Sequence, residues 1–153
     1  MIDPATSVRT TTRVRFGETD QMGIVYHANY VVYFEIGRTE FMRQRSVAYA
    51  KMEQSGLSLA VVGMDARFRR SARYDQILTI ETRLVEATHV QICFEYRIFG
   101  PDEEGAALLC EGSTRLACVD DQQRPIRIPS PWRELIDAAV CPPESGDGIS
   151  GAR

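Results

Sequence analysis

The chain has 153 residues, 44% of them hydrophobic and 25% charged, a composition that fits one folded domain and excludes a fibrous repeat or disorder throughout. Its 18 basic and 21 acidic residues give a formal charge of -3, which argues against attraction of the whole surface to nucleic acid or anionic lipid. The four cysteines form no C-x-x-C pair, no secretory signal precedes them, and no apolar run approaches the roughly 20 residues of a membrane helix. We therefore expect reduced thiols, a cytoplasmic location, no membrane insertion and no nucleic-acid partner.

The two ends of the chain differ from the rest in composition. Residues 1–7 are short and polar, and residues 141–153 (CPPESGDGISGAR) are rich in Pro, Gly and Ser and nearly free of large apolar side chains. Such segments bury too little surface to hold one conformation, so we expect a flexible N-terminus and a flexible C-terminal tail. No repeat or linker divides residues 8–140, which we predict to form a single domain.

The first part of that domain predicts a strand, a loop and two helices. From Val8 to Phe16, apolar and threonine side chains alternate with polar ones, the period of a half-buried strand. Gly17–Ala28 follow as a loop that holds two glycines. Asn29–Gln44 contains no proline and carries aromatic residues at helical spacing, which predicts a long helix, and a short helix is predicted over Ser46–Gln54.

The second part predicts an antiparallel meander and one more helix. Polar turn segments separate four stretches in which apolar and polar residues alternate. Ser130 followed by Pro131 is a typical helix start, with a hydroxyl cap and proline at the first helical position. One long helix combined with antiparallel strands indicates an α+β fold whose sheet packs its apolar face against that helix. The predicted elements are strands over Leu57–Arg70, Ile77–Ala87, Val90–Gly100 and Leu108–Asp120, and a helix over Trp132–Val140.

The segment with the most chemical information joins the first strand to the long helix. Glu18 and Asp20 lie in a loop with glycines, 11 and 9 residues before the helix is expected to begin. A helix start offers unpaired N–H groups that can hold the oxygen of a polarised carbonyl, and a nearby carboxylate can act on that carbonyl as general base or as nucleophile. Acyl transfer is therefore possible here. The alternative is that Asp20 only accepts hydrogen bonds from backbone amides of its own turn.

Several other kinds of site are excluded by the absence of their motifs. The chain has no G-x-S-x-G elbow, no phosphate-binding glycine loop of either common type and no H-E-x-x-H. Its two histidines, His27 and His89, are far apart in the predicted order of elements and lack cysteine or carboxylate neighbours at ligand spacing. We therefore expect no metal. Cys93, Cys110 and Cys118 fall in strands without a matched histidine, which favours structural thiols over nucleophiles.

The loop sequence GETDQMGIVYHANY resembles the 4-hydroxybenzoyl-CoA thioesterase family of hotdog-fold enzymes, including the acyl-CoA thioesterases associated with the Tol-Pal system. Asp20, Gly23, Val25 and Tyr30 match its signature D-x-x-G-x-V-x-x-x-x-Y, and Arg67–Thr82 resembles the segment that receives the pantetheine arm. The resemblance implies a curved antiparallel sheet of about five strands around one long helix, homodimers or homotetramers with sites between subunits, and hydrolysis of acyl-CoA without a cofactor. The segment before Glu18 is closer to the aromatic-substrate branch.

The resemblance also implies roles for individual residues. Asp20 is the expected catalytic carboxylate, as general base or nucleophile, and the backbone N–H of His27 is expected to hold the thioester oxygen. The imidazole of His27 would line the acyl pocket or assist proton transfer. Arginines near the second matching segment can bind the CoA phosphates, or can form the solvated face of a strand. The expected substrate-binding residues are Gly23, Val25, Tyr26, Asn29, Tyr30, Arg69, Arg70 and Arg73.

Two further functions compete with hydrolysis of acyl-CoA. The same fold can serve as a non-catalytic module that binds acyl thioesters or acts as a scaffold, since a fold alone does not define an activity. Dehydration of 3-hydroxyacyl thioesters would need a histidine with a carboxylate partner, for which His27 is the candidate. The pattern leaves open the acyl group and the choice between CoA and an acyl carrier protein as the thiol.

Overall fold

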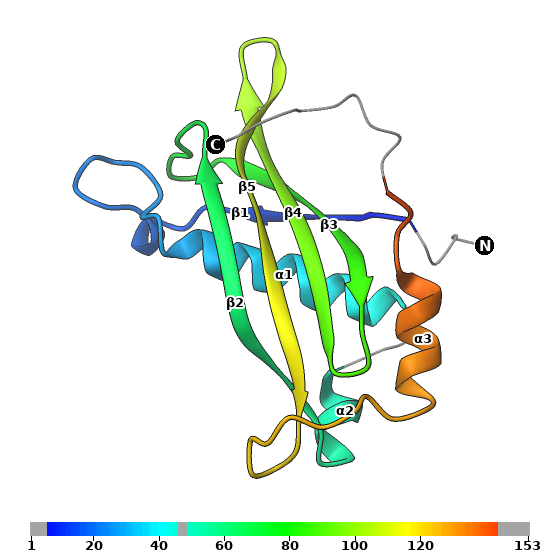
Figure 1. Cartoon of the computed structure of the whole chain (residues 1–153). Coiled ribbons are helices and arrows are strands. Elements are labelled where there is room, and N and C mark those ends of the chain that lie inside the picture. The colour runs from blue at the N-terminus through cyan, green and yellow to red at the C-terminus, as the bar shows by residue number, and fades with distance from the viewer. Residues whose placement is uncertain (1–5, 46–48, 144–153) are drawn as a thin grey trace.

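A computed structural model describes residues 6–45 and 49–143 of the chain. Its five strands form one antiparallel sheet in the order β1-β3-β4-β5-β2, and α1 lies across one face of that sheet (Figure 1). The predicted α+β class is confirmed. The elements are β1 (Val8–Arg13), the 3-10 helix η1 (Phe16–Glu18), α1 (Asn29–Gln44), α2 (Tyr49–Gln54), β2 (Ser58–Phe68), β3 (Ile77–Ala87), β4 (Gln91–Asp102), β5 (Gly105–Val119) and α3 (Trp132–Ala139).

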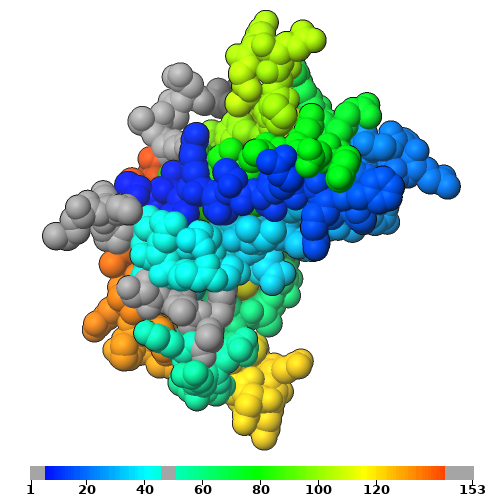
Figure 2. All heavy atoms as spheres, turned by 180° about the vertical axis from the view of Figure 1, so that it is seen from behind, coloured from blue at the N-terminus to red at the C-terminus, as the bar shows by residue number. Residues whose placement is uncertain are grey.

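Helix α1 packs against the sheet through aromatic side chains. Phe34 is fully buried and stacks on Tyr96 of β4 with ring centroids 4.5 Å apart, and Phe41 meets Phe94 edge to face. Such ring pairs add about 1 kcal/mol each beyond the area that they bury. The opposite side of α1 forms part of the molecular surface beside β1 (Figure 2). The helix therefore has one face in the core and one face open.

Two glycines allow the helix and the sheet to come close together. A Cβ atom on Gly37 of α1 would overlap the Thr82 hydroxyl of β3, so only glycine fits where these elements cross. A Cβ on Gly112 of β5 would overlap the carbonyl oxygen of Asp65 in β2 and lie 2.9 Å from the Phe34 ring. Neither glycine has a positive φ angle. The requirement for glycine at these two positions therefore comes from close packing and not from backbone conformation.

The element boundaries confirm most of the sequence prediction and correct some of it. Helix α1 and strand β3 have the predicted bounds. The first strand ends at Arg13 instead of Phe16, because Phe16–Glu18 turn into η1. The β4–β5 hairpin is longer than expected and pairs as far as Asp102 with Gly105. Of the short helix predicted over Ser46–Gln54, residues 49–54 are helical and 46–48 lie outside the described residues.

The C-terminal helix differs from the prediction at both ends. Ser130 is not its cap: Pro131 holds the cap position, no side chain caps the helix, and the helix ends at Ala139. Cys141, which the sequence places in the tail, is buried, and its N–H donates to the carbonyl oxygen of Leu84 at 2.7 Å. Residues 1–5 and 144–153 of the predicted flexible ends lie outside the described residues.

Glu81 of β3 is the centre of an ion-pair network on the face of the sheet opposite α1. The Nε atoms of Arg9 and Arg97 each donate to its buried carboxylate at 2.9 Å. Burial alone would raise the pKa of the Glu81 carboxyl, but the two guanidinium groups bring that pKa below its ordinary value. The network therefore stabilises the fold only while Glu81 is ionised.

A Glu81→Gln variant is expected to lose about 2 kcal/mol of unfolding free energy at pH 7, because two charge-assisted hydrogen bonds are weakened. The wild-type advantage is complete above the unfolded-state pKa of about 4.3 and is lost as the pH falls through the lower folded-state pKa. Urea denaturation of both proteins at pH 7 and about pH 3 measures this difference. Glu103→Gln, in the exposed β4–β5 turn, is the control. An equal difference at both pH values would contradict the network.

No helix among the described residues is long and apolar enough to cross a membrane.

Candidate active site

The loop between η1 and α1 is held in a tight fold by its own backbone. Thr19 and Val25 form an antiparallel bridge. The N–H of Asp20 donates to the carbonyl oxygen of Ile24 at 2.9 Å, and the N–H of Gly23 donates to the backbone carbonyl oxygen of Asp20 at 2.9 Å. Gly23 makes the reversal with a φ of +76°, a conformation that favours glycine. The loop is joined to the chain after β2 by a bridge between Ile24 and Arg73. Asp20 is thus fixed at the base of the loop.

A hollow of about 250 Å³ lies between this loop and the end of β2. Six of the predicted site residues line it together: Asp20, Val25, His27, Tyr30, Arg69 and Arg70. The remaining lining residues are Met22, Ile24, Phe68 and Ser71. Gly23, Tyr26, Asn29 and Arg73 are not among the lining residues, although Arg73 lies beside Gly23. A larger hollow on the outer face of the sheet contains mixed charged groups and none of the predicted site residues.

The carboxylate of Asp20 makes a turn contact with one of its two oxygens. Its Oδ1 accepts a hydrogen bond from the N–H of Met22 at 2.9 Å, which is the turn contact of the structural alternative. In the part of the chain that the structure describes, its Oδ2 has no hydrogen-bond partner. One oxygen therefore holds the turn and the other is available to a ligand in the hollow.

The start of α1 provides a free donor at the same hollow. The first N–H groups of the helix point back to carbonyls one turn earlier: Asn29 to Tyr26 at 2.9 Å and Tyr30 to His27 at 3.2 Å. The N–H of His27 makes no hydrogen bond within residues 6–45 and 49–143, and no side chain caps the helix. The positive end of the helix dipole lies here. A carbonyl oxygen that gains negative charge would be stabilised at this N–H.

The His27 imidazole lies among aromatic rings. Its centroid is 4.4 Å from that of Tyr26 and 6.5 Å from that of Phe68. Tyr30 is buried beside them, and burial raises the pKa of its hydroxyl, so this group stays neutral at physiological pH. The rings of Tyr30 and Phe68 are 5.3 Å apart. These aromatic side chains form an apolar wall next to the polar loop.

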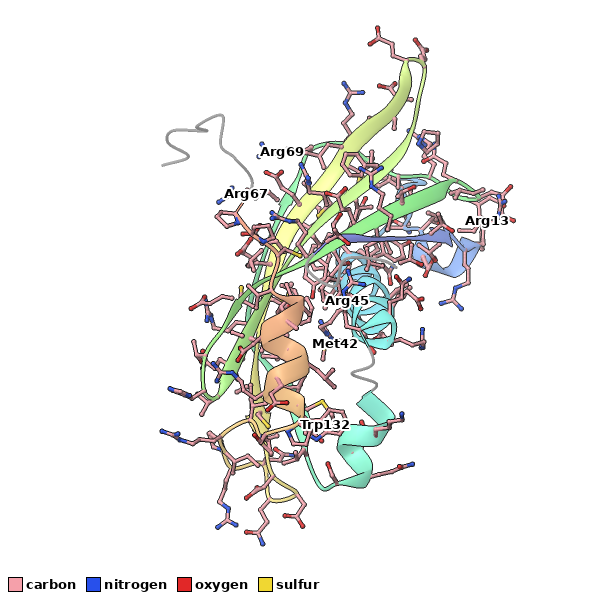
Figure 3. All side chains as sticks on the ribbon, turned by 90° about the vertical axis from the view of Figure 1, so that its right-hand side faces the viewer. Arg13, Met42, Arg45, Arg67, Arg69 and Trp132 are labelled. Carbon is pink, nitrogen blue, oxygen red and sulfur yellow. The ribbon has the colours of Figure 1, made fainter. Side chains whose placement is uncertain are left out.

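Two of the arginines that follow β2 form ion pairs with different acidic residues. Arg69 donates to Glu111 at 2.7 Å and Arg70 donates to Asp102 at 2.8 Å. Arg67 and Arg69 extend away from α1, on the outer side of the sheet (Figure 3). Arg73 has no acidic partner within the described residues. The arginine cluster is therefore not one cradle: Arg69 and Arg70 are ion-paired, whereas Arg67 and Arg73 have no acidic partner among the described residues.

Glu18 is the residue whose importance sequence reasoning missed. Only 8% of it is exposed, and its carboxylate accepts hydrogen bonds from the backbone N–H of Arg15 at 2.8 Å and the hydroxyl of Tyr33 at 3.2 Å. Its carbonyl oxygen accepts from the side-chain amide of Asn29 at 2.8 Å. Burial and the negative charge of Glu18 raise the pKa of Tyr33, so its hydroxyl remains a donor. The signal in the sequence was that Asn29 and Tyr33 are four residues apart in the predicted helix, so that both can face the same neighbour, Glu18.

The cysteines are not among the residues that line this hollow. All four are free thiols and buried. Burial raises the pKa of Cys110 to about 12 and also raises the pKa values of Cys93 and Cys118, so these groups stay protonated and weakly nucleophilic. Within residues 6–45 and 49–143, no three His, Cys, Asp or Glu side chains lie close enough together to hold a metal ion.

Comparisons with known proteins identify the family of this chain and similar structures. A family model described as "Thioesterase-like superfamily" matches residues 14–142. The putative acyl-CoA thioesterase YneP of Bacillus subtilis is 33% identical over 115 residues, which are 74% of this chain and 81% of the relative. The acyl-CoA thioester hydrolase YbgC of Escherichia coli O157:H7 is 30% identical over 115 residues, 75% and 84% of the two chains. A DHNA-CoA thioesterase structure from Staphylococcus aureus matches with a TM-score of 0.80 and 28% identity over 87% of this chain and 88% of that chain. The sheet around α1 is the hotdog fold that the sequence predicted.

Proposed function

The chain belongs to the thioesterase-like superfamily, and on this premise we propose that it hydrolyses acyl-CoA thioesters to a free carboxylic acid and CoA. The observation that carries the proposal is that one hollow is lined by Asp20, which has an uncommitted carboxylate oxygen, and by His27, whose N–H has no partner in the described chain. Hydrolysis of a thioester uses both groups: the carboxylate activates the nucleophile, and the N–H holds the carbonyl oxygen. The apolar wall of Tyr30 and Phe68 beside them suits the acyl group.

The reaction that we propose has two steps. Asp20 accepts a proton from a water molecule as the water oxygen attacks the carbonyl carbon, and the N–H of His27 donates to the oxygen that becomes negative. The C–S bond then breaks and CoA leaves as a thiolate, which is stable enough to depart without a strong general acid because thiol pKa values are near 8.5. In the alternative, Asp20 attacks the carbon directly and water cleaves the resulting anhydride. A single turnover in ¹⁸O-water that leaves the label in Asp20 would identify direct attack, with water cleaving the anhydride at the Asp20 carboxyl carbon.

The test of the function is release of thiol from a panel of short-chain, long-chain and aromatic acyl-CoAs, with the corresponding thioesters of an acyl carrier protein included. We expect turnover on at least one CoA thioester. Turnover only on carrier-protein thioesters would support thioester hydrolysis and would identify the carrier protein, instead of CoA, as the thiol of the substrate. Saturable binding without turnover on any thioester would contradict hydrolysis and favour the binding module.

We propose that Arg73 contacts the phosphates of CoA, since its guanidinium group lies beside Gly23 of the loop without an acidic partner in the described chain. Arg73→Ala is expected to raise KM for acyl-CoA about fivefold, the equivalent of one exposed charge contact, with kcat unchanged. The same variant should show wild-type KM for a pantetheine thioester, which lacks the nucleotide. Arg124→Ala, at an exposed arginine paired with Asp120, is the control. An equal rise with both substrates would exclude a phosphate contact.

We propose that the protein is a homodimer, or a homotetramer built from such dimers, that associates along β2. This edge strand exposes Val61, Val62, Met64 and Phe68, and an unpaired apolar edge invites pairing with a second chain. Val62→Lys is expected to shift the mass measured by light scattering after size exclusion toward the monomer. Leu135→Lys, on α3, should leave the mass unchanged. A monomeric wild-type protein would contradict the proposal. We also propose a cytoplasmic location, because the four cysteines are free.

A further inference from the structure

Glu18 makes hydrogen bonds to residues on both sides of the loop that carries Asp20 and His27. Its carboxylate joins the end of the first strand region, through Arg15, to the second turn of α1, through Tyr33. Its carbonyl oxygen accepts from the N–H of Tyr26 at 2.9 Å and from the side chain of Asn29 at 2.8 Å. One residue thus receives four donors from positions before the loop, at its end and in the helix.

The two groups proposed for catalysis are enclosed by these bonds. Asp20 lies two residues after Glu18, and His27 lies between Tyr26 and Asn29, both of which donate to the Glu18 carbonyl. The separation between the Asp20 carboxylate and the His27 N–H therefore depends on where Glu18 holds the two ends of the loop. A displacement of about 1 Å between reacting groups can lower a rate a hundredfold.

The carboxylate of Glu18 is an unusual choice for this position. Both close donors, the Arg15 N–H and the Tyr33 hydroxyl, are neutral and reach the same oxygen, Oε1, whereas the Arg15 guanidinium is 3.5 Å from Oε2. Burying a carboxylate is unfavourable unless it is well bonded, and a buried hydroxyl that loses its partner is unfavourable as well. Glu18 and Tyr33 therefore depend on each other, and through them the loop is joined to the body of α1.

We propose that Glu18, supported by Tyr33, is a positioning residue that fixes the Asp20 carboxylate relative to the His27 N–H; this rests on the function proposed above. Glu18 does not touch the substrate in this role. It acts by hydrogen bonding, so a side chain of the same shape and bonding capacity replaces it, and a side chain that cannot bond does not.

The test compares variants at Glu18 and Tyr33 with a matched loss of a buried hydroxyl elsewhere. With the best acyl-CoA of the panel, Tyr33→Phe is expected to lower kcat about tenfold and Glu18→Ala about thirtyfold, with KM within about twofold of wild type. Glu18→Gln keeps the one oxygen that accepts from both the Arg15 N–H and the Tyr33 hydroxyl, so it should retain at least about a third of wild-type kcat. Tyr96→Phe removes a buried hydroxyl that bonds Arg38 and Thr114 and should leave kcat unchanged.

A second measurement does not depend on catalysis. Hydrogen exchange followed by mass spectrometry should show exchange of the residue 20–28 amides at least about tenfold faster in Glu18→Ala and Tyr33→Phe than in wild type or Tyr96→Phe, because bonds that close the loop are lost. Wild-type kcat in folded Tyr33→Phe, or equal effects of Tyr33→Phe and Tyr96→Phe, would overturn the proposal. A folded Glu18→Gln as inactive as Glu18→Ala would assign the carboxylate to the chemistry and overturn it too. If wild type hydrolyses no thioester, the proposed function fails, and unchanged loop exchange would show separately that the positioning role fails.

Discussion

Asp20→Asn is expected to lower kcat for acyl-CoA about a thousandfold while the protein stays folded, since general-base catalysis contributes 10²–10⁴-fold. Asparagine keeps an oxygen that accepts from the Met22 N–H, so the turn survives. Its amide nitrogen can neither take a proton from water nor attack the thioester carbon. Both mechanisms considered for Asp20 therefore fail in this variant. Thiol release measured beside wild type, with circular dichroism and thermal unfolding on the same samples, checks the result.

Asp120→Asn is the matched control for that experiment. Asp120 also accepts a hydrogen bond from the backbone N–H two residues later, from Gln122 at 2.9 Å, in an exposed loop after β5. Its replacement by asparagine removes the same charge from the same kind of turn, and turnover should stay at the wild-type value. Turnover of Asp20→Asn within about threefold of wild type would remove Asp20 from the mechanism.

Gly112→Ala is expected to reduce the unfolding free energy by about 3 kcal/mol, the upper part of the range for overpacking a tight core. The added methyl group would overlap the carbonyl oxygen of Asp65 on the neighbouring strand and press on the ring of Phe34. A backbone carbonyl in a paired strand cannot rotate away, and Phe34 is already stacked on Tyr96. Strand β5 or helix α1 must therefore move. Urea denaturation with a constant m-value measures the loss.

Gly17→Ala is the control for added volume, because no atom lies within 4 Å of the position where its Cβ would be and its φ is not positive. Its unfolding free energy should lie within about 0.5 kcal/mol of wild type. If Gly112→Ala were equally harmless, the close approach of α1 and the two strands at this point would be wrong.

Local patterns predicted the regular elements well because the same residues that give the pattern make the packing. The aromatic residues that indicate a helix over Asn29–Gln44 are the ones that pack on the sheet, and β3 shows the same agreement. Prediction failed where alternation continued past a strand, at Phe16, which is exposed in η1. It also failed at the start of α3. The Ser-Pro pair predicted Ser130 as the cap, but Pro131 holds the cap position and no side chain caps the helix.

The candidate site was predictable where it is continuous in sequence and unpredictable where it depends on distant partners. Asp20, Val25, His27 and Tyr30 belong to one segment, so their meeting in the hollow follows from the loop and helix start. The partners of Arg69 and Arg70 lie 42 and 32 residues away, and no local pattern shows which arginine they neutralise. Similarly, the bond between Glu18 and Tyr33, fifteen residues apart, exists only after the loop has folded against α1.

The two strands that lead into the candidate site lie at opposite edges of the sheet, so the site requires the whole sheet to be formed. Loop residues 19–28 follow β1, and Phe68–Ser71 form the end of β2 and the residues after it, yet these two strands occupy opposite edges of the sheet (Figure 1). Between them stands the β3-β4-β5 meander, whose hairpins are local in sequence, whereas both edge strands pair with partners at long sequence separation. The residues that line the hollow all lie within Asp20–Ser71, but that fragment lacks β3, β4 and β5, which hold the two edge strands in one sheet. The meander can form by local pairing, but the site exists only when both distant edges have joined it, so its presence reports that the whole topology has been completed.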